Sequence, residues 1–193
     1  MNLANQLTIA RFYLTLLFVA VLSVPWRYSA TTALVIFLLA GVTDYLDGEF
    51  ARRFKMVSDF GKLMDPLVDK IMMAAAFICL VERREIPAWV AAAIISREFL
   101  ITGLRLLAAS KGTVLPAERL GKHKTAWQII TIIFFLGLLA VPELVQTADL
   151  HRAAWWVNLH RFGGGALIAC ALVLTLYSGF GYLWKHRALI EAR

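Results

Sequence analysis

The sequence predicts an all-α, polytopic membrane protein with six transmembrane helices, and three observations support this fold class. Of the 193 residues, 60% are hydrophobic and 17% are charged. The mean hydropathy of +0.69 is far above that of a water-soluble domain of this size. The apolar residues also occur in runs of about 20, the length of helix that crosses about 30 Å of hydrocarbon. A soluble single-domain enzyme is therefore excluded.

The first three helices are expected at three apolar runs, residues 7–24, 29–54 and 61–82. The first run has the length of a signal peptide, but it lacks a positively charged start and a small-residue cleavage site, so we expect a retained helix. Pro25 and Trp26 follow it, a turn signal and a residue typical of membrane interfaces. The second and third runs are joined by a short turn, so the helices that they predict are neighbours in space.

The last three helices are expected at residues 87–110, 121–141 and 163–184. Proline marks the joints beside them, at Pro87, Pro116 and Pro142. We expect the fifth helix to end before Pro142, because proline lacks the backbone N–H that a continuing helix needs. The three glycines at 163–165 predict close packing between helices rather than a ligand site. Since the sequence has neither an internal repeat nor a long linker, residues 1–193 are expected to form one domain.

The Lys and Arg residues of the connections indicate how the chain crosses the membrane. Ten lie on the side that carries both termini: Arg52, Arg53, Lys55, Lys111, Arg119, Lys122, Lys124, Lys185, Arg187 and Arg193. Five lie on the other side: Arg27, Arg83, Arg84, Arg152 and Arg161. Because positive residues concentrate on the cytoplasmic side, both termini are expected in the cytoplasm. Topology and anionic lipid headgroups then explain the net charge of +7, and no nucleic-acid partner is expected.

Nine ionisable residues fall within or at the ends of these helices, where a charge is costly unless it is paired or functional. They are Arg11, Asp44, Asp47, Asp65, Asp69, Lys70, Arg97, Glu98 and Arg105. With the topology above, most of them lie toward the cytoplasmic half of their helices. A polar cavity open to the cytoplasm explains this convergence, and a structural ion pair is the alternative for any single residue.

Four carboxylates repeat at helical spacing on the second and third helices. Asp44 and Asp47 are three residues apart and Asp65 and Asp69 are four apart, so each pair lies on one helix face. Like charges that face each other need cations, and all-oxygen ligands favour a hard divalent ion such as Mg²⁺ or Mn²⁺. Two ions about 3.5–4 Å apart fit four bridging carboxylates. The sequence therefore predicts a metal-binding cavity at the cytoplasmic side.

The carboxylates belong to a longer pattern with eight specified positions, Asp44-x2-Asp47-Gly48-x2-Ala51-Arg52-x8-Gly61-x3-Asp65-x3-Asp69. This pattern resembles, without mismatch, the signature of the CDP-alcohol phosphotransferases, which move a phosphatidyl or similar group from a CDP-linked donor to an alcohol. The flanking residues, among them Asn5, Thr8 and Arg97, are most similar to the phosphatidylglycerophosphate synthases of that family. The resemblance covers most of residues 2–128, and Ala4 departs from it where those proteins often have proline.

The resemblance implies that the phosphatidyl group of CDP-diacylglycerol is transferred to sn-glycerol 3-phosphate, with release of CMP. It implies metal binding by four carboxylates, Asp44, Asp47, Asp65 and Asp69, with Asp69 also accepting the proton of the attacking hydroxyl as the catalytic residue. It implies donor binding by Asn5, Thr8, Gly48, Ala51, Arg52 and Gly61. The acceptor phosphate would be bound by cations, as phosphate requires: Arg97, Arg105, Lys122 and Lys124.

Other interpretations stay open. Within the family the acceptor is alternatively serine, inositol phosphate or another alcohol. The cations favour a phosphorylated acceptor over serine, and only the flanking resemblance argues against inositol phosphate. In a different class, the charges belong to a transporter, although the sequence shows no inverted repeat. For Lys122 and Lys124, membrane topology alone is a sufficient explanation. We expect a bacterial inner membrane with the active site facing the cytoplasm, and a homodimer stays open.

Overall fold

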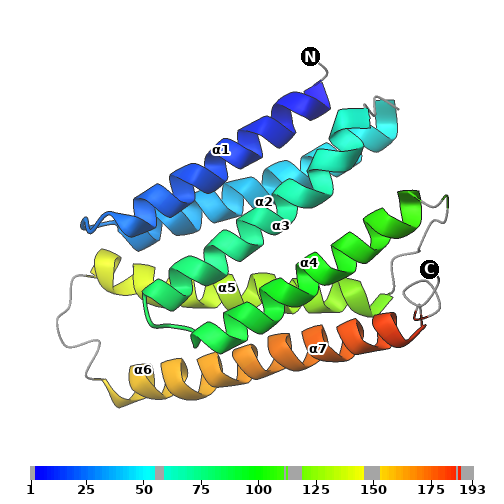
Figure 1. Cartoon of the computed structure of the whole chain (residues 1–193). Coiled ribbons are helices and arrows are strands. Elements are labelled where there is room, and N and C mark those ends of the chain that lie inside the picture. The colour runs from blue at the N-terminus through cyan, green and yellow to red at the C-terminus, as the bar shows by residue number, and fades with distance from the viewer. Residues whose placement is uncertain are drawn as a thin grey trace.

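The computed structural model (Figure 1) describes residues 3–54, 59–110, 112, 119–145, 153–185 and 187, with the side chains of residues 3–8, 44–54, 59–66, 119–120 and 122 left aside. All regular structure in this part of the chain is helical. The elements are α1 (Leu3–Ser23), α2 (Ser29–Phe54), α3 (Asp59–Glu82), α4 (Ala88–Ser110), α5 (Arg119–Val145), α6 (Ala154–Asn158), the π-helical turn η2 (Leu159–Gly163) and α7 (Gly164–Lys185). The six predicted helices are thus found. Helix α1 begins at Leu3 rather than at residue 7, and two further differences in helix ends have a tertiary cause.

The first difference is that α5 runs through Pro142 to Val145 instead of ending before the proline. Its last turn is held by a contact with another helix. The carboxylate of Glu143 accepts hydrogen bonds from the backbone N–H groups of Ala30 and Thr31, at 2.9 and 2.8 Å. It therefore caps the first turn of α2, where backbone N–H groups lack partners within the helix. The prediction at Pro142 was wrong because this contact joins residues far apart in the sequence.

The second difference is that the last helical segment begins at Ala154 rather than at residue 163. Trp156 is buried against the main core, so the chain is already packed there. The imidazole of His160 in η2 lies 2.5 Å from the carboxylate of Glu85, in the turn between α3 and α4. These contacts continue the helix before the glycines. Gly164 itself packs closely, since a Cβ atom there would lie 2.8 Å from the ring of Phe135 in α5, as the predicted role of the glycine run requires.

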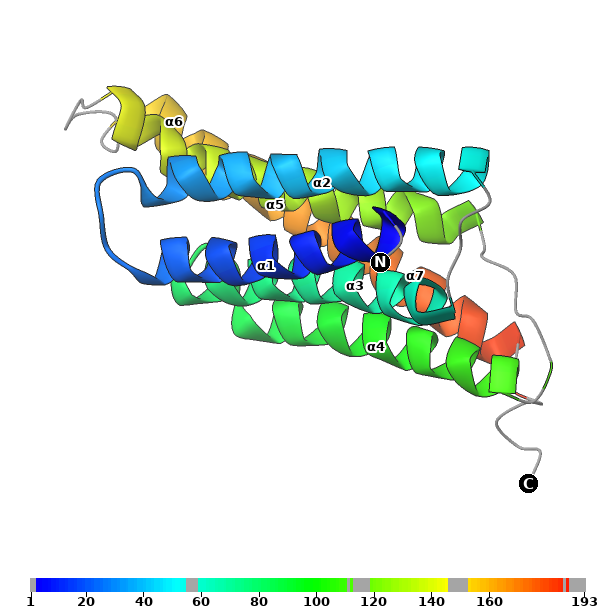
Figure 2. The ribbon, with the colours of Figure 1, turned by 90° about the horizontal axis from the view of Figure 1, so that it is seen from above.

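The long helices form a closed ring. Going round it, α1 packs on α3, α3 on α4, α4 on α7, α7 on α5, α5 on α2, and α2 on α1 (Figure 2). A further contact between α3 and α5 crosses the middle of the ring. Helix α1 begins and α7 ends at the same end of the bundle, which we call the termini end (Figure 1). The other end is called the opposite end.

The apolar core occupies the half of the bundle toward the opposite end. Large side chains from five helices meet there with almost no solvent exposure: Phe18, Ile36, Phe37, Phe77, Ile94 and Phe135. The half toward the termini end has few residues of this kind and instead holds buried polar groups. The two halves of the same helices therefore differ in what they place inside the ring.

The outer surface is apolar. Within the part of the chain that the structure describes, two helical segments are long and apolar enough to cross a membrane, His123–Val145 and Ala154–Lys185. Aromatic side chains project from the outside of the bundle with most of their surface exposed, among them Trp89 at 66% and Phe180 at 70%. An apolar surface of this extent is typical of helices in contact with lipid rather than water.

Candidate active site

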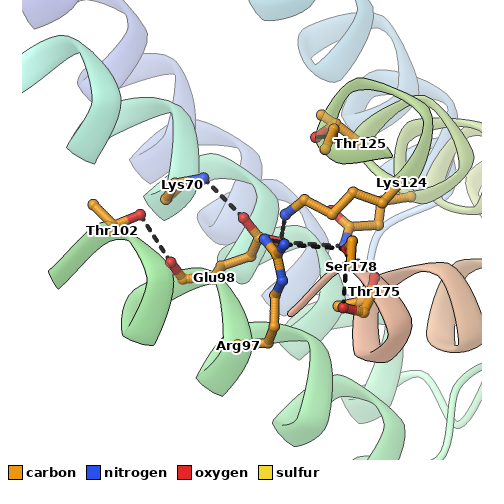
Figure 3. Close-up of polar contacts among 10 residues, drawn as sticks. Lys70, Arg97, Glu98, Thr102, Lys124, Thr125, Thr175 and Ser178 are labelled. Carbon is orange, nitrogen blue, oxygen red and sulfur yellow. Dashed lines mark hydrogen bonds and ion pairs between the residues drawn. The ribbon is translucent and has the colours of Figure 1, made fainter. Parts of the chain in front are cut away.

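A cavity of about 490 Å³ lies between α3, α4, α5 and α7, in the half of the bundle toward the termini end. Its walls carry four cations, Lys70, Arg97, Arg105 and Lys124, and one carboxylate, Glu98. Figure 3 shows Lys70 of α3, Arg97 and Glu98 of α4, and Lys124 of α5 pointing toward one another. The cavity is a shared feature of the ring rather than a groove on one helix.

Glu98 of α4 joins three of the cations. Its carboxylate accepts a hydrogen bond from Nζ of Lys70 at 2.8 Å and a second one from Nζ of Lys124. Nη1 of Arg97 lies 3.4 Å from the same carboxylate. Glu98 and Lys124 are both buried, so each depends on the other as a partner inside the bundle. Glu98 therefore fixes the positions of cations from α3, α4 and α5.

Helix α7 contributes neutral partners. Nη2 of Arg97 donates to Oγ of Ser178 at 3.1 Å, and Nε of Arg105 donates to the phenol oxygen of Tyr182 at 3.2 Å. The Arg105 guanidinium also lies 5.4 Å from the centre of the Tyr182 ring. A Cβ atom at Gly179 would lie 2.8 Å from Cγ of Arg97, so this glycine lets the arginine side chain pass over α7. The last helix thus shapes the cavity directly.

The cavity is strongly positive. Four basic side chains face one carboxylate among the described lining residues. A buried positive excess attracts an anion, and guanidinium groups bind phosphate through paired, charge-assisted hydrogen bonds. The arrangement is therefore suited to hold a small ligand that carries a phosphate group.

A second cavity of about 110 Å³ lies beside the first, between α1, α2, α3 and α5. Arg11 and Asp69 line it, together with Ala40 and Gly41 of α2. Ile129 of α5 lines both cavities, and Asp69 precedes Lys70 of the larger one. A carboxylate is thus placed next to the cationic cavity.

The structure brings three of the predicted acceptor residues together, since Arg97, Arg105 and Lys124 all line the larger cavity. It places Asp69 at the smaller cavity. For the other predicted residues the side chains lie outside the described residues, and only their positions on α1, α2, α3 and α5 are given: Asn5, Thr8, Asp44, Asp47, Gly48, Ala51, Arg52, Gly61, Asp65 and Lys122.

The predicted metal site falls mostly on these residues. Among the described side chains, no three His, Cys, Asp or Glu residues lie together. Asp69 is the one predicted ligand whose side chain is described. Binding of Mg²⁺ or Mn²⁺ therefore stays a prediction.

The residues of α7 at the site were not predicted from the sequence. Thr175, Ser178 and Tyr182 lie at helical spacing on one face of a helix that is otherwise apolar. This polar face on an apolar helix was the sequence feature that could have indicated their role at the site. It was easily overlooked because each residue is neutral, and serine, threonine and tyrosine are common in transmembrane helices without a ligand.

The fold and the cavity define a class, a helical membrane protein with a buried cationic site suited to a phosphate compound. Comparison with known proteins gives the family. The profile of the CDP-alcohol phosphatidyltransferase family matches residues 1–177. The chain therefore belongs to the CDP-alcohol phosphatidyltransferase family.

Three relatives are each named CDP-diacylglycerol--glycerol-3-phosphate 3-phosphatidyltransferase. The protein of Bacillus subtilis (strain 168) is 38% identical, over 96% of this chain and 95% of its own length. The protein of Pseudomonas fluorescens is 34% identical, over 96% and 92%. The protein of Rickettsia bellii (strain RML369-C) is 33% identical, over 94% and 93%. The similarity thus extends over nearly the whole chain, including α7.

Proposed function

We propose that this chain transfers the phosphatidyl group of CDP-diacylglycerol to sn-glycerol 3-phosphate, giving phosphatidylglycerophosphate and CMP. The observation that carries the proposal is the cavity in which Arg97, Arg105 and Lys124 converge beside Asp69. The names of the relatives support both substrates. The product is an intermediate of phosphatidylglycerol and cardiolipin synthesis.

The acceptor is held by its phosphate in the larger cavity. Lys124 and Lys70 are tied to Glu98, whereas the contacts of Arg105 within the described part of the chain are to a neutral oxygen and a ring. The charge of Arg105 is therefore the most available to a ligand. A phosphorylated acceptor suits this site better than serine, because serine offers no dianion to balance the excess charge.

The donor and its metal ions belong at the end of α2 and the start of α3. Asp44 follows Ala40 of the smaller cavity by one helical turn, and Asp65 precedes Asp69 by one turn. The register of both helices thus continues the smaller cavity toward the predicted ligands, which is the fit expected of a shared site. Divalent ions bound there would neutralise the pyrophosphate of the donor. Activity should vanish in a chelator and return with Mg²⁺ or Mn²⁺.

Side chains of the protein hold the two substrates in position for the transfer. A hydroxyl of glycerol 3-phosphate attacks the phosphatidyl phosphorus, and the bond from that phosphorus to the oxygen of CMP breaks. The hydroxyl proton passes to the carboxylate of Asp69, and CMP leaves with the bonding electrons. The cations of the larger cavity hold the acceptor so that its hydroxyl points toward Asp69. Orientation of this kind supplies a large part of the rate enhancement in transfer reactions.

We place six membrane spans in the chain, with both termini and the cavity at the cytoplasmic side of a bacterial inner membrane. The ring of six long helices, the exposed apolar surface and the excess of Lys and Arg near the termini end support this topology. The packed aromatic core toward the opposite end argues against a transport path through the ring. The walls of both cavities come from a single chain.

The test is an assay of the purified protein in detergent with labelled glycerol 3-phosphate and CDP-diacylglycerol. We expect the label to appear in a lipid, with one CMP released for each label transferred. The control assays replace the acceptor with serine, inositol phosphate and unphosphorylated glycerol. Faster use of any of these would contradict the proposed acceptor, and movement of glycerol 3-phosphate across a vesicle membrane without lipid formation would favour a transporter.

A further inference from the structure

The polar face of α7 consists of Thr175, Ser178 and Tyr182, at relative exposures of 0%, 3% and 2%. Each contacts a polar residue of a neighbouring helix. Thr175 accepts a hydrogen bond from Nε2 of Gln128 at 2.8 Å, Ser178 accepts from Arg97, and Tyr182 accepts from Arg105. Buried polar groups are tolerated when they are hydrogen-bonded. These three residues thus form a buried, hydrogen-bonded polar face on an otherwise apolar helix, and Ser178 and Tyr182 line the cavity.

The two arginines of the cavity are held in different ways. Arg97 contacts both the carboxylate of Glu98 and the hydroxyl of Ser178, so it has a charged partner within the chain. Arg105 donates from Nε to the phenol oxygen of Tyr182, and its guanidinium carbon lies 5.4 Å from the centre of the same ring. Because Nε is used in this way, the two terminal nitrogens of Arg105 are the donors that suit a paired contact with phosphate oxygens. The direction of that fork is set by Tyr182.

The family profile matches residues 1–177, so Arg97 and Arg105 lie inside the matched range, and Ser178 and Tyr182 lie after it.

We propose that Tyr182 is a positioning residue for acceptor specificity, orienting the Arg105 guanidinium toward the phosphate of the acceptor through a hydrogen bond to Nε. This inference rests on the proposed function. Tyr182 acts on the acceptor alone, through Arg105. Ser178 has a weaker role of the same kind at Arg97, because Glu98 also holds that arginine.

The experiment compares two tyrosines of α7. Tyr182→Phe removes the phenol oxygen and keeps the ring, whereas Tyr177→Phe makes the same change at a residue 68% exposed on the outside of the helix. We expect Tyr182→Phe to raise KM for glycerol 3-phosphate about tenfold, the scale of one hydrogen bond to a charged group. KM for CDP-diacylglycerol and kcat should change less than twofold. Tyr177→Phe should match the wild type in all three.

A double variant tests whether Tyr182 acts through Arg105. In an Arg105→Ala background, Tyr182→Phe should cause no further rise in KM for glycerol 3-phosphate. Independent, multiplicative effects of the two changes would overturn the inference, as would an unchanged KM in Tyr182→Phe alone. A rise in KM for both substrates together would also overturn it, since a general packing defect predicts that result.

Ser178→Ala keeps the inference testable even where Tyr182→Phe does not fold. It should raise KM for glycerol 3-phosphate about twofold with the donor KM unchanged, and no change would count against a positioning role for α7. Failure of the proposed function is separable from failure of this inference. The former appears as a wild-type protein that does not label lipid from glycerol 3-phosphate, and the latter as an active wild type that Tyr182→Phe matches.

Discussion

At the opposite end of the bundle, Phe77 of α3 and Phe135 of α5 point into a core of tightly packed apolar side chains. Two or three turns away along the same helices, Lys70 and Lys124 point into a cavity and share the carboxylate of Glu98. The first half gains more free energy from burial of apolar surface, because the buried cluster beside the cavity is small, with Ile101, Leu104 and Tyr182. The second half retains buried charge and an open volume, both of which cost stability. The packed half therefore holds the helices in place while the other half keeps a site.

Charged residues also occur at the opposite end, and there they have a structural role. Glu143 caps α2, Nη2 of Arg83 donates to the backbone oxygen of Leu22, and His160 contacts Glu85. These contacts join the ends of neighbouring helices. The cavity near the termini end differs in carrying more cations than its described carboxylate can match. The charged groups of the opposite end thus serve in contacts between helices, whereas the cavity holds several cations around one described carboxylate.

The largest effect that separates the two halves is expected at Asp69. Asp69→Asn should lower kcat by about 10³-fold, because a general base typically contributes between about 10² and 10⁴. The matched change at the opposite end, Glu85→Gln, should leave kcat within twofold. Initial rates at saturating substrates measure both. If Asp69→Asn were folded and nearly as active as the wild type, the proton would be accepted elsewhere.

A substitution at Glu98 tests how much the half with the cavity depends on this carboxylate for its stability. Glu98→Gln leaves Lys70, Lys124 and Arg97 without the carboxylate that they share, and loss of one partner from a buried ion pair costs about 3–5 kcal/mol. We expect a fall in Tm of about 10 °C in detergent. The matched change Glu143→Gln removes a helix cap worth about 1 kcal/mol, so its Tm should fall by only a few degrees.

Equal falls in Tm for Glu98→Gln and Glu143→Gln would contradict this difference between the two halves. They would show that the ion pairs of Glu98 contribute no more to stability than a helix cap does. Thermal unfolding followed by circular dichroism measures both variants under the same conditions. Excess glycerol 3-phosphate should raise the Tm of the wild type.

Substitutions at Arg105 test whether the cations of the cavity bind the acceptor phosphate. Arg105→Ala should raise KM for glycerol 3-phosphate about 10- to 100-fold, since charge-assisted hydrogen bonds to the acceptor phosphate are lost. KM for CDP-diacylglycerol should stay near that of the wild type. Arg105→Lys should recover part of the loss, because a lysine supplies the charge without the planar fork. A selective rise in the donor KM would assign Arg105 to the nucleotide instead.

The smallest effect is expected in the packed half. Gly164→Ala places a Cβ atom 2.8 Å from the ring of Phe135, and such overpacking costs about 1–3 kcal/mol. The Tm should fall while both KM values stay unchanged. Gly165→Ala is the control, since a Cβ atom there meets nothing within 4 Å. A change in KM from Gly164→Ala would show that the two halves are less independent than their packing indicates.

The fold could be predicted from the sequence wherever an apolar run has polar or turn residues at both ends. Helix α2, for example, begins at Ser29 and ends at Phe54, as the run between those residues predicts. The prediction was wrong at Pro142, where the Glu143 cap on α2 holds the last turn of α5. It also missed the segment from Ala154, which is stabilised by the burial of Trp156. Both errors come from tertiary contacts that local patterns do not contain.

The residues of the site could be predicted where a charged side chain falls within an apolar helix. Arg97 and Arg105 stand out in an apolar helix, and their spacing of eight residues places them on one face, where the structure puts both at the cavity. Glu98 and Lys70 were recognised as charges that need an explanation, but their pairing depends on the packing of α3 against α4. The α7 partners were missed because a neutral hydroxyl in a membrane helix is a weak signal.

In the proposed function, the cavity near the termini end binds the phosphate of the acceptor from the cytoplasmic side. It is tested most directly with a cysteine at Thr102, which lines the cavity, in a chain whose Cys79 and Cys170 are replaced by alanine. A membrane-impermeant thiol reagent should modify Thr102→Cys in inverted membrane vesicles, and glycerol 3-phosphate should slow the modification while glycerol does not. Modification from the outer side alone, or equal protection by glycerol, would contradict the account.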